Sequence, residues 1–106
     1  MLLFSNSAQL NGLKPEMVCV LIVLAELFNE TGETIYVSSA LDGKHMRASL
    51  HKIGHALDFW SETFTSEEVI DELAKDVKIR LTSEYDVIAE WHDGNGQHLH
   101  VEFQPK

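Results

Sequence analysis

Two short segments of this chain carry residues with the types and spacing of a metal site. His51 and Asp58 lie seven residues apart, and His98 and His100 follow near the C-terminus. Imidazole nitrogen and carboxylate oxygen are both zinc ligands, and a catalytic zinc takes three protein ligands and leaves a fourth position open for water. These residues therefore predict a catalytic Zn2+ site and metal-assisted hydrolysis.

The choice of ligands among these residues stays open on spacing alone. Alternate residues of a strand share a face, so His98, His100 and Glu102 are expected to point the same way. Two alternate histidines alone are a weak signal of a metal site. With a His and an Asp in a second segment, the types and the number of candidate ligands match those of a zinc site. Three ligands would come from the set His51, Asp58, His98 and His100.

A metallohydrolase also needs a general base beside the attacking water, and Glu90 is the candidate. Its direction depends on how its strand pairs with the strand that carries the histidines, because a slip of one residue turns every side chain to the other face. A loop over 93–97 would place Glu90 opposite His100. A loop one residue shorter would place Ala89 there and turn Glu90 away. Both registers stay open.

The segments that must position these residues predict an α+β domain. Helices are expected over 14–30, between Pro15 and Gly32, and from the N-cap Ser66 to about Leu81. The first helix is apolar on most faces and is expected to be largely buried. Strands are expected over 34–38, 56–60, 85–91 and 98–103, with an irregular loop over 40–55 and a closing hairpin. This order predicts a small, mostly antiparallel sheet with about two main helices.

Length and composition limit the classes of protein to consider. The 106 residues fit a single domain over 1–106, and a net charge of -9 argues against partners such as nucleic acid or anionic membranes. Cys19 is the only cysteine, so an internal disulfide is excluded, and its apolar surroundings predict a buried thiol in a reducing compartment. The first residues lack the features of a signal peptide, and the apolar run 17–25 is too short for a membrane span. We therefore expect synthesis in the cytoplasm without membrane insertion.

The spacing of these residues resembles that of a known family of enzymes. The pattern Ser49-x-His51-x-x-Gly54-x-Ala56-x-Asp58, followed by a late His, is similar to the D-Ala-D-Ala carboxypeptidase family of zinc peptidases. That family includes cell-wall carboxypeptidases, L-Ala-D-Glu endopeptidases and phage endolysins, and the compact phage members look most similar. The resemblance implies the zinc peptidase fold of this family.

A second resemblance concerns the zinc site of the hedgehog amino-terminal signalling domain. Asp42-Gly43-x-His45 looks like a loop of that domain, and Glu90 followed by His98-x-His100 looks like the layout of its site. Together the resemblances imply roles for six residues: zinc ligands His51, Asp58 and His100, general base Glu90, and His45 and His98 flanking the water or polarising the scissile carbonyl. They imply a hydrolase that cleaves peptidoglycan stem peptides. If the protein is a phage lysin, it acts at the cell wall and needs a holin or another partner to reach it.

Two departures from the family pattern define the alternatives. Many cell-wall members carry an acid three residues before the last ligand, where this chain has Gln97, and many carry an Arg in the region that reads 38–42 here without one. These departures favour a non-catalytic, zinc-stabilised binding or phage structural module. A third hypothesis is a globular domain whose histidines bind no metal. The bond cleaved, D-Ala-D-Ala or L-Ala-D-Glu, stays open.

Overall fold

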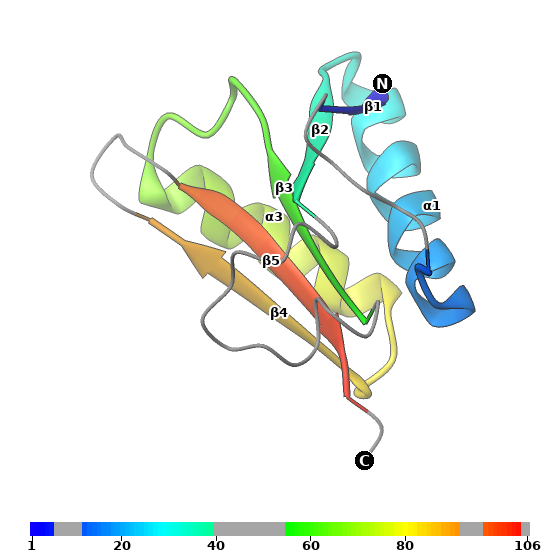
Figure 1. Ribbon diagram of the computed structural model, residues 1–106. Helices are drawn as coiled ribbons and strands as arrows, with labels where there is room; N and C mark the ends of the chain where they lie inside the picture. The colour runs from blue at the N-terminus through cyan, green and yellow to red at the C-terminus, as the bar shows by residue number, and fades with distance from the viewer. Residues whose placement is uncertain (6–11, 40–54, 92–96, 105–106) are drawn as a thin grey trace.

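The computed structural model describes residues 1–5, 12–39, 55–91 and 97–104. Their helices and strands, in chain order, are β1 (Leu2–Phe4), α1 (Pro15–Thr31), β2 (Ile35–Ser39), β3 (Ala56–Trp60), α3 (Glu67–Arg80), β4 (Tyr85–Glu90) and β5 (His98–Phe103). The strands form one sheet, and α3 lies behind the strands in the view of Figure 1. The predicted α+β class, with two main helices and a mostly antiparallel sheet, is confirmed.

The order of strands in the sheet is β1-β2-β3-β5-β4. β1 runs parallel to β2, and the other neighbouring strands are antiparallel. β5 therefore lies between its hairpin partner β4 and the much earlier strand β3, next to the centre of the sheet. The two strands that carry Asp58 and His100 are neighbours, although a helix and a strand separate them in the sequence.

The two faces of the sheet differ in chemistry. Leu57 pairs with Val101 and Phe59 with Leu99, and these four side chains are fully buried on the face that the helices cover. Because successive side chains of a strand point to opposite faces, Asp58 and its partner His100 lie on the other face. The sheet thus separates a hydrophobic core from a row of polar side chains.

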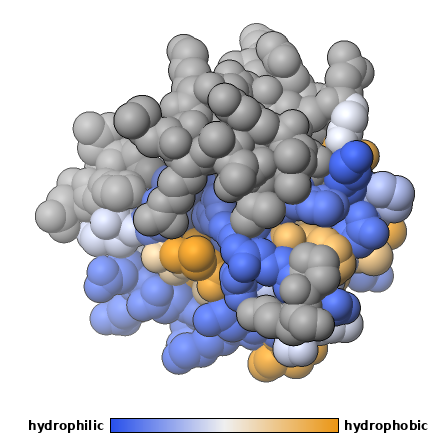
Figure 2. Space-filling view, turned by 60° about the horizontal axis from the view of Figure 1, so that its bottom comes forward, coloured by the Kyte–Doolittle hydropathy of each residue, from blue (hydrophilic) through white to orange (hydrophobic). Residues whose placement is uncertain are grey.

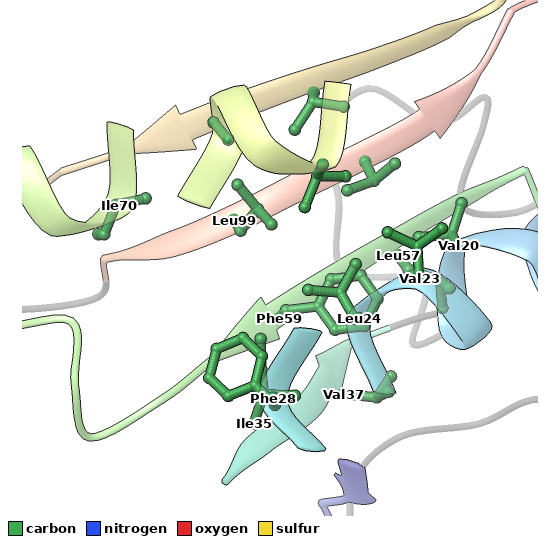
Figure 3. Close-up of a cluster of buried hydrophobic side chains, with 14 of the residues drawn as sticks. Val20, Val23, Leu24, Phe28, Ile35, Val37, Leu57, Phe59, Ile70 and Leu99 are labelled. Carbon is green, nitrogen blue, oxygen red and sulfur yellow. The ribbon is translucent and has the colours of Figure 1, made fainter. Parts of the chain in front are cut away.

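The core joins both helices to the sheet (Figure 3). α3 contributes Ile70, Ala74 and Val77, which recur at the spacing of one helical face. The buried residues of α1 are Met17, Val20, Val23, Leu24 and Phe28. Burial of these side chains away from water holds β3 and β5 in place from one side, and the close packing of the core fixes the strand positions that the polar face depends on.

The ends of α1 agree with the sequence prediction. Pro15 occupies the first turn, where its missing N–H costs no hydrogen bond. Gly32 ends the helix in the left-handed conformation with φ of 76°, and its N–H donates to the Phe28 carbonyl oxygen at 3.0 Å. A residue with a Cβ is strained at that φ, so glycine suits the position.

The outer face of α1 corrects two expectations. Cys19 is exposed, so the predicted buried thiol is wrong. Val18 and Ile22 are also exposed, at 47% and 52%, so the helix is only partly buried. α1 packs against the core with one face. The apolar residues on its other faces stay exposed because no second layer of structure covers them in the described part of the chain.

The described surface in the view of Figure 2 is mainly hydrophilic, with separate hydrophobic patches. The net charge of -9 agrees with this polar surface. In the described part of the chain, neither helix combines the length and hydrophobicity that a bilayer crossing requires.

Candidate functional site

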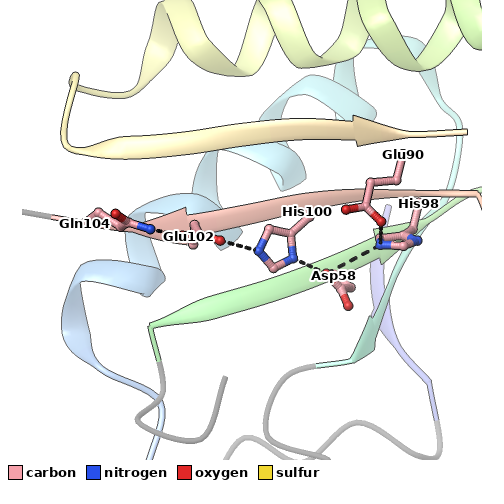
Figure 4. A network of polar contacts seen from close by, with 6 residues as sticks. All are labelled: Asp58, Glu90, His98, His100, Glu102 and Gln104. Atoms are coloured by element: carbon pink, nitrogen blue, oxygen red, sulfur yellow. Dashed lines mark hydrogen bonds and ion pairs between the residues drawn. The ribbon is translucent and has the colours of Figure 1, made fainter. Parts of the chain in front are cut away.

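Acidic and histidine side chains lie along the face of the sheet opposite the helices (Figure 4). On β5, His98, His100 and Glu102 alternate with the buried Leu99 and Val101, so the expectation that the three polar residues share a face is confirmed. β3 contributes Asp58, which pairs directly with His100. The predicted Asp58 and His100 are therefore brought together by strand pairing.

Asp58 and His100 are in direct contact. The Asp58 Oδ1 and His100 Nδ1 atoms are 2.6 Å apart, and the Asp58 side chain is only 8% exposed. The His98 Nε2 atom lies 4.0 Å from the same Oδ1 atom. One carboxylate thus faces both histidines, at a depth where an unpaired charge would be costly.

The His100 ring lies between two carboxylates. Its Nδ1 faces Asp58, and its Nε2 is 2.7 Å from Glu102 Oε1. Burial lowers the pKa of His100, but the hydrogen bonds and charges of Asp58 and Glu102 outweigh burial and raise the pKa from 6.5 to about 8. Without a metal, His100 is mainly an imidazolium at neutral pH that donates from both nitrogens. A metal on Nδ1 would replace that proton.

Glu90 and His98 form a second pair on the same face. Glu90 is the last residue of β4 and lies directly opposite His98, with Ile88 opposite His100. The Glu90 Oε2 and His98 Nε2 atoms are 3.0 Å apart. Glu90 and His98 are 40% and 25% exposed, so water can reach both side chains.

Both hairpin registers considered from the sequence are wrong. The residues between the two strands are 91–97, two more than the 93–97 loop that would have set Glu90 opposite His100. The shift is even, so Glu90 keeps the face that it has in the first register. A register shift by an even number of residues keeps a side chain on its face of the sheet, and an odd shift turns it to the other face. The length of the loop sets which residue lies opposite it.

Two of the predicted site residues lie outside the described residues. His51 and His45 fall in the segment 40–54, so the third ligand and one flanking histidine are not placed. Among the described residues, no group of three or more His, Cys, Asp or Glu side chains has the arrangement of a metal site. Of the three zinc ligands that the resemblance implies, Asp58 and His100 lie among the described residues and His51 does not.

The described donors are chemically suited to zinc. A carboxylate oxygen and an imidazole nitrogen meet at Asp58 and His100, and the other ring nitrogen of His100 is held by Glu102, as is usual for a metal-binding histidine. Two donors on one tetrahedral zinc lie about 3.4 Å apart, given zinc bond lengths of about 2.1 Å. The 2.6 Å contact would therefore have to open by a fraction of an ångström to admit the ion.

Gln97 takes no part in the polar row. Its Nε2 donates to the Phe64 carbonyl oxygen at 3.2 Å, which ties the side chain to the turn after β3. The motif resembles a family in which many cell-wall members have an acid at this position, where this chain has Gln97. His55 also lies elsewhere, packed edge-on against Phe103 and 3.7 Å from Glu16.

Sequence reasoning gave no role to Glu102 or to Gln104. Glu102 contacts His100, and Gln104 donates to the second Glu102 carboxylate oxygen. Strand alternation placed Glu102 on the face of the histidines, and the same alternation extended one step beyond β5 would have indicated Gln104.

Comparison of the chain with protein-family models, curated proteins and solved structures gave no match. The likeness to zinc peptidases therefore depends on the motif residues and their spacing.

Proposed function

We propose that this chain is a zinc-dependent peptidase that hydrolyses peptide bonds of peptidoglycan stem peptides, with the fold of the D-Ala-D-Ala carboxypeptidase and hedgehog-like zinc domains. The observation that carries the proposal is the contact of Asp58 with His100 beside the Glu90–His98 pair, on one face of the sheet. This places a potential ligand pair next to a potential base. The motif containing His51 supplies the third ligand of the proposal.

The proposed zinc is held by His51, Asp58 and His100. When bound, Zn2+ supplies a Lewis acid that polarises the scissile carbonyl and lowers the pKa of water towards neutrality. The protein contributes the remaining chemistry through groups beside this position.

Glu90 acts as the general base. Its carboxylate takes a proton from the attacking water and passes it to the leaving amine. His98, held 3.0 Å from Glu90, or His45 donates to the oxyanion that develops on the scissile carbonyl. The pairing with His98 orients the Glu90 carboxylate over the polar row, which supports this division of roles.

Metal dependence tests the proposal. Protein purified with zinc is expected to release peptide fragments from peptidoglycan, to lose this activity after treatment with a chelator, and to regain it when Zn2+ is added back. Activity that is unaffected by complete removal of zinc, verified by elemental analysis, would reject the zinc mechanism.

A non-catalytic zinc-stabilised module is the second candidate. It is favoured by Gln97, which stands where many cell-wall peptidases have an acid and which is tied to Phe64. This candidate predicts stoichiometric zinc and no hydrolysis of any stem peptide. Release of fragments by the wild-type protein would exclude it.

A further inference from the structure

Glu102 is the second carboxylate in contact with the His100 ring. Glu102 Oε1 is 2.7 Å from His100 Nε2, and the Glu102 side chain is 14% exposed. A glutamate at this depth gives up much of its hydration, which is compensated only if it has partners. We propose that Glu102 is a positioning residue that selects and aims the zinc-binding nitrogen of His100, an inference that rests on the proposed zinc site.

The geometry of the ring explains how Glu102 would act. When a metal displaces the proton on Nδ1, a carboxylate that accepts from Nε2–H keeps the remaining proton on Nε2, so that Nδ1 is the nitrogen that binds the metal. Nδ1 is the nitrogen that faces Asp58, 2.6 Å away. Glu102 therefore directs the donor atom of His100 towards the other described ligand and raises its basicity.

Glu102 is itself held from two sides. Its backbone pairs with Ala56 of β3 and with Asp86 of β4, so the Cα position is fixed within the sheet. Gln104 donates to the Glu102 Oε2 atom, while Oε1 faces His100. Figure 4 shows the resulting series from Gln104 through Glu102 and His100 to Asp58. Such support is what keeps a metal ligand in one orientation.

The test is the zinc affinity of Glu102 variants, measured by competition with a chromophoric chelator. Glu102→Ala is expected to weaken Zn2+ binding by about 10–100-fold, the usual effect of losing such a partner. Glu102→Gln keeps an acceptor oxygen without the charge, so its affinity should fall between those of the alanine variant and the wild type.

Asp86→Asn is the matched control. Asp86 lies opposite Glu102 on β4, so this change also removes one negative charge from the neighbourhood but leaves the His100 contact intact. Its zinc affinity should stay within about threefold of wild type, because the Asp86→Asn change keeps the contact between Glu102 and His100 that orients the ring.

The Co2+-substituted protein gives a readout besides affinity. Its visible absorption reports ligand geometry, and we expect the spectrum to change in Glu102→Ala and to match the wild type in Asp86→Asn. Circular dichroism verifies the fold of each variant, and Glu102→Gln serves if the alanine variant does not fold.

The outcomes separate this inference from the proposed function. Wild-type affinity and an unchanged cobalt spectrum in both Glu102 variants would overturn the positioning role while leaving the zinc site in place. Equal losses in Glu102→Gln and Asp86→Asn would also overturn it, since charge alone would then explain the effect. The expected order of affinities without any hydrolysis of peptidoglycan would uphold the positioning role and reject the peptidase. A wild-type protein that binds no zinc would reject both.

Discussion

At the scale of single residues, the polar row has an excess of negative charge. Three carboxylates, from Asp58, Glu90 and Glu102, face two histidines. The imidazolium form of His100 offsets part of this charge in the metal-free protein. A divalent cation bound beside Asp58 and His100 would offset more of it.

The ligand assignment predicts a difference between two histidines that are close in sequence. His51→Ala is expected to lose stoichiometric zinc, because it removes one of three proposed ligands. His55→Ala is the control, since His55 packs against Phe103 and Glu16 away from the polar row. Elemental analysis of the purified variants measures the effect. Full zinc content in His51→Ala would remove that residue from the site.

The sequence predicted which face of the sheet the site residues share better than it predicted their contacts. Alternation along β5 was enough to place His98, His100 and Glu102 on one face. It could not give the distance between Asp58 and His100, because that depends on pairing between strands far apart in the chain. The Glu90–His98 pairing was also missed, since it follows from the length of a loop.

At the scale of elements, Tyr85, the first residue of β4, links this strand to α1. Its hydroxyl donates to the Glu16 carbonyl oxygen at 2.7 Å, and its ring packs against Phe103 at 5.1 Å between centroids. Burial, followed by the proximity of Cys19, raises the pKa of Tyr85 above 10.0. The neutral hydroxyl is therefore the form that the fold favours.

Tyr85→Phe is expected to lower the free energy of unfolding by about 1 kcal/mol at neutral pH, the usual net value of one hydrogen bond. Because the folded-state pKa is raised, the advantage of the wild type is fully present below pH 10 and is lost as the pH rises through the folded-state value. Urea titrations of both proteins between pH 7 and pH 11 check this. A difference that grows above pH 10 would contradict it, and Tyr36→Phe is the control for losing a hydroxyl.

The elements with strong local signals were predicted close to their observed bounds. Pro15 and Gly32 frame α1, and the Ser66 side chain accepts from the Val69 N–H at the start of α3. β1 was not predicted, because three residues give no usable period and the strand that pairs with it in the described sheet is the distant β2. The exposure of Cys19 was not predicted either. An apolar sequence does not tell which faces of a helix are covered by other elements.

At the scale of the whole molecule, the proposed zinc would join the segment around His51 to β3 and β5 if His51, Asp58 and His100 are its ligands. A ligand that binds only the folded state stabilises it by mass action, by about 2.7 kcal/mol at a free concentration about 100 times its Kd. For a chain of this length, chelation is then expected to lower Tm by roughly 10–20 °C. Differential scanning calorimetry measures this shift. His51→Ala should show no shift, and an unchanged wild-type Tm would argue against a zinc that bridges these segments.

We propose that this face of the sheet carries out zinc-dependent hydrolysis with Glu90 as the base. The most direct measurement is digestion of purified peptidoglycan by the zinc-loaded wild type and by Glu90→Gln, with zinc content measured for both and products identified by mass. We predict that both proteins hold one zinc and that only the wild type releases fragments, whose masses name the bond cleaved. Equal release by Glu90→Gln, or no release by a folded wild type that holds zinc, would contradict the account.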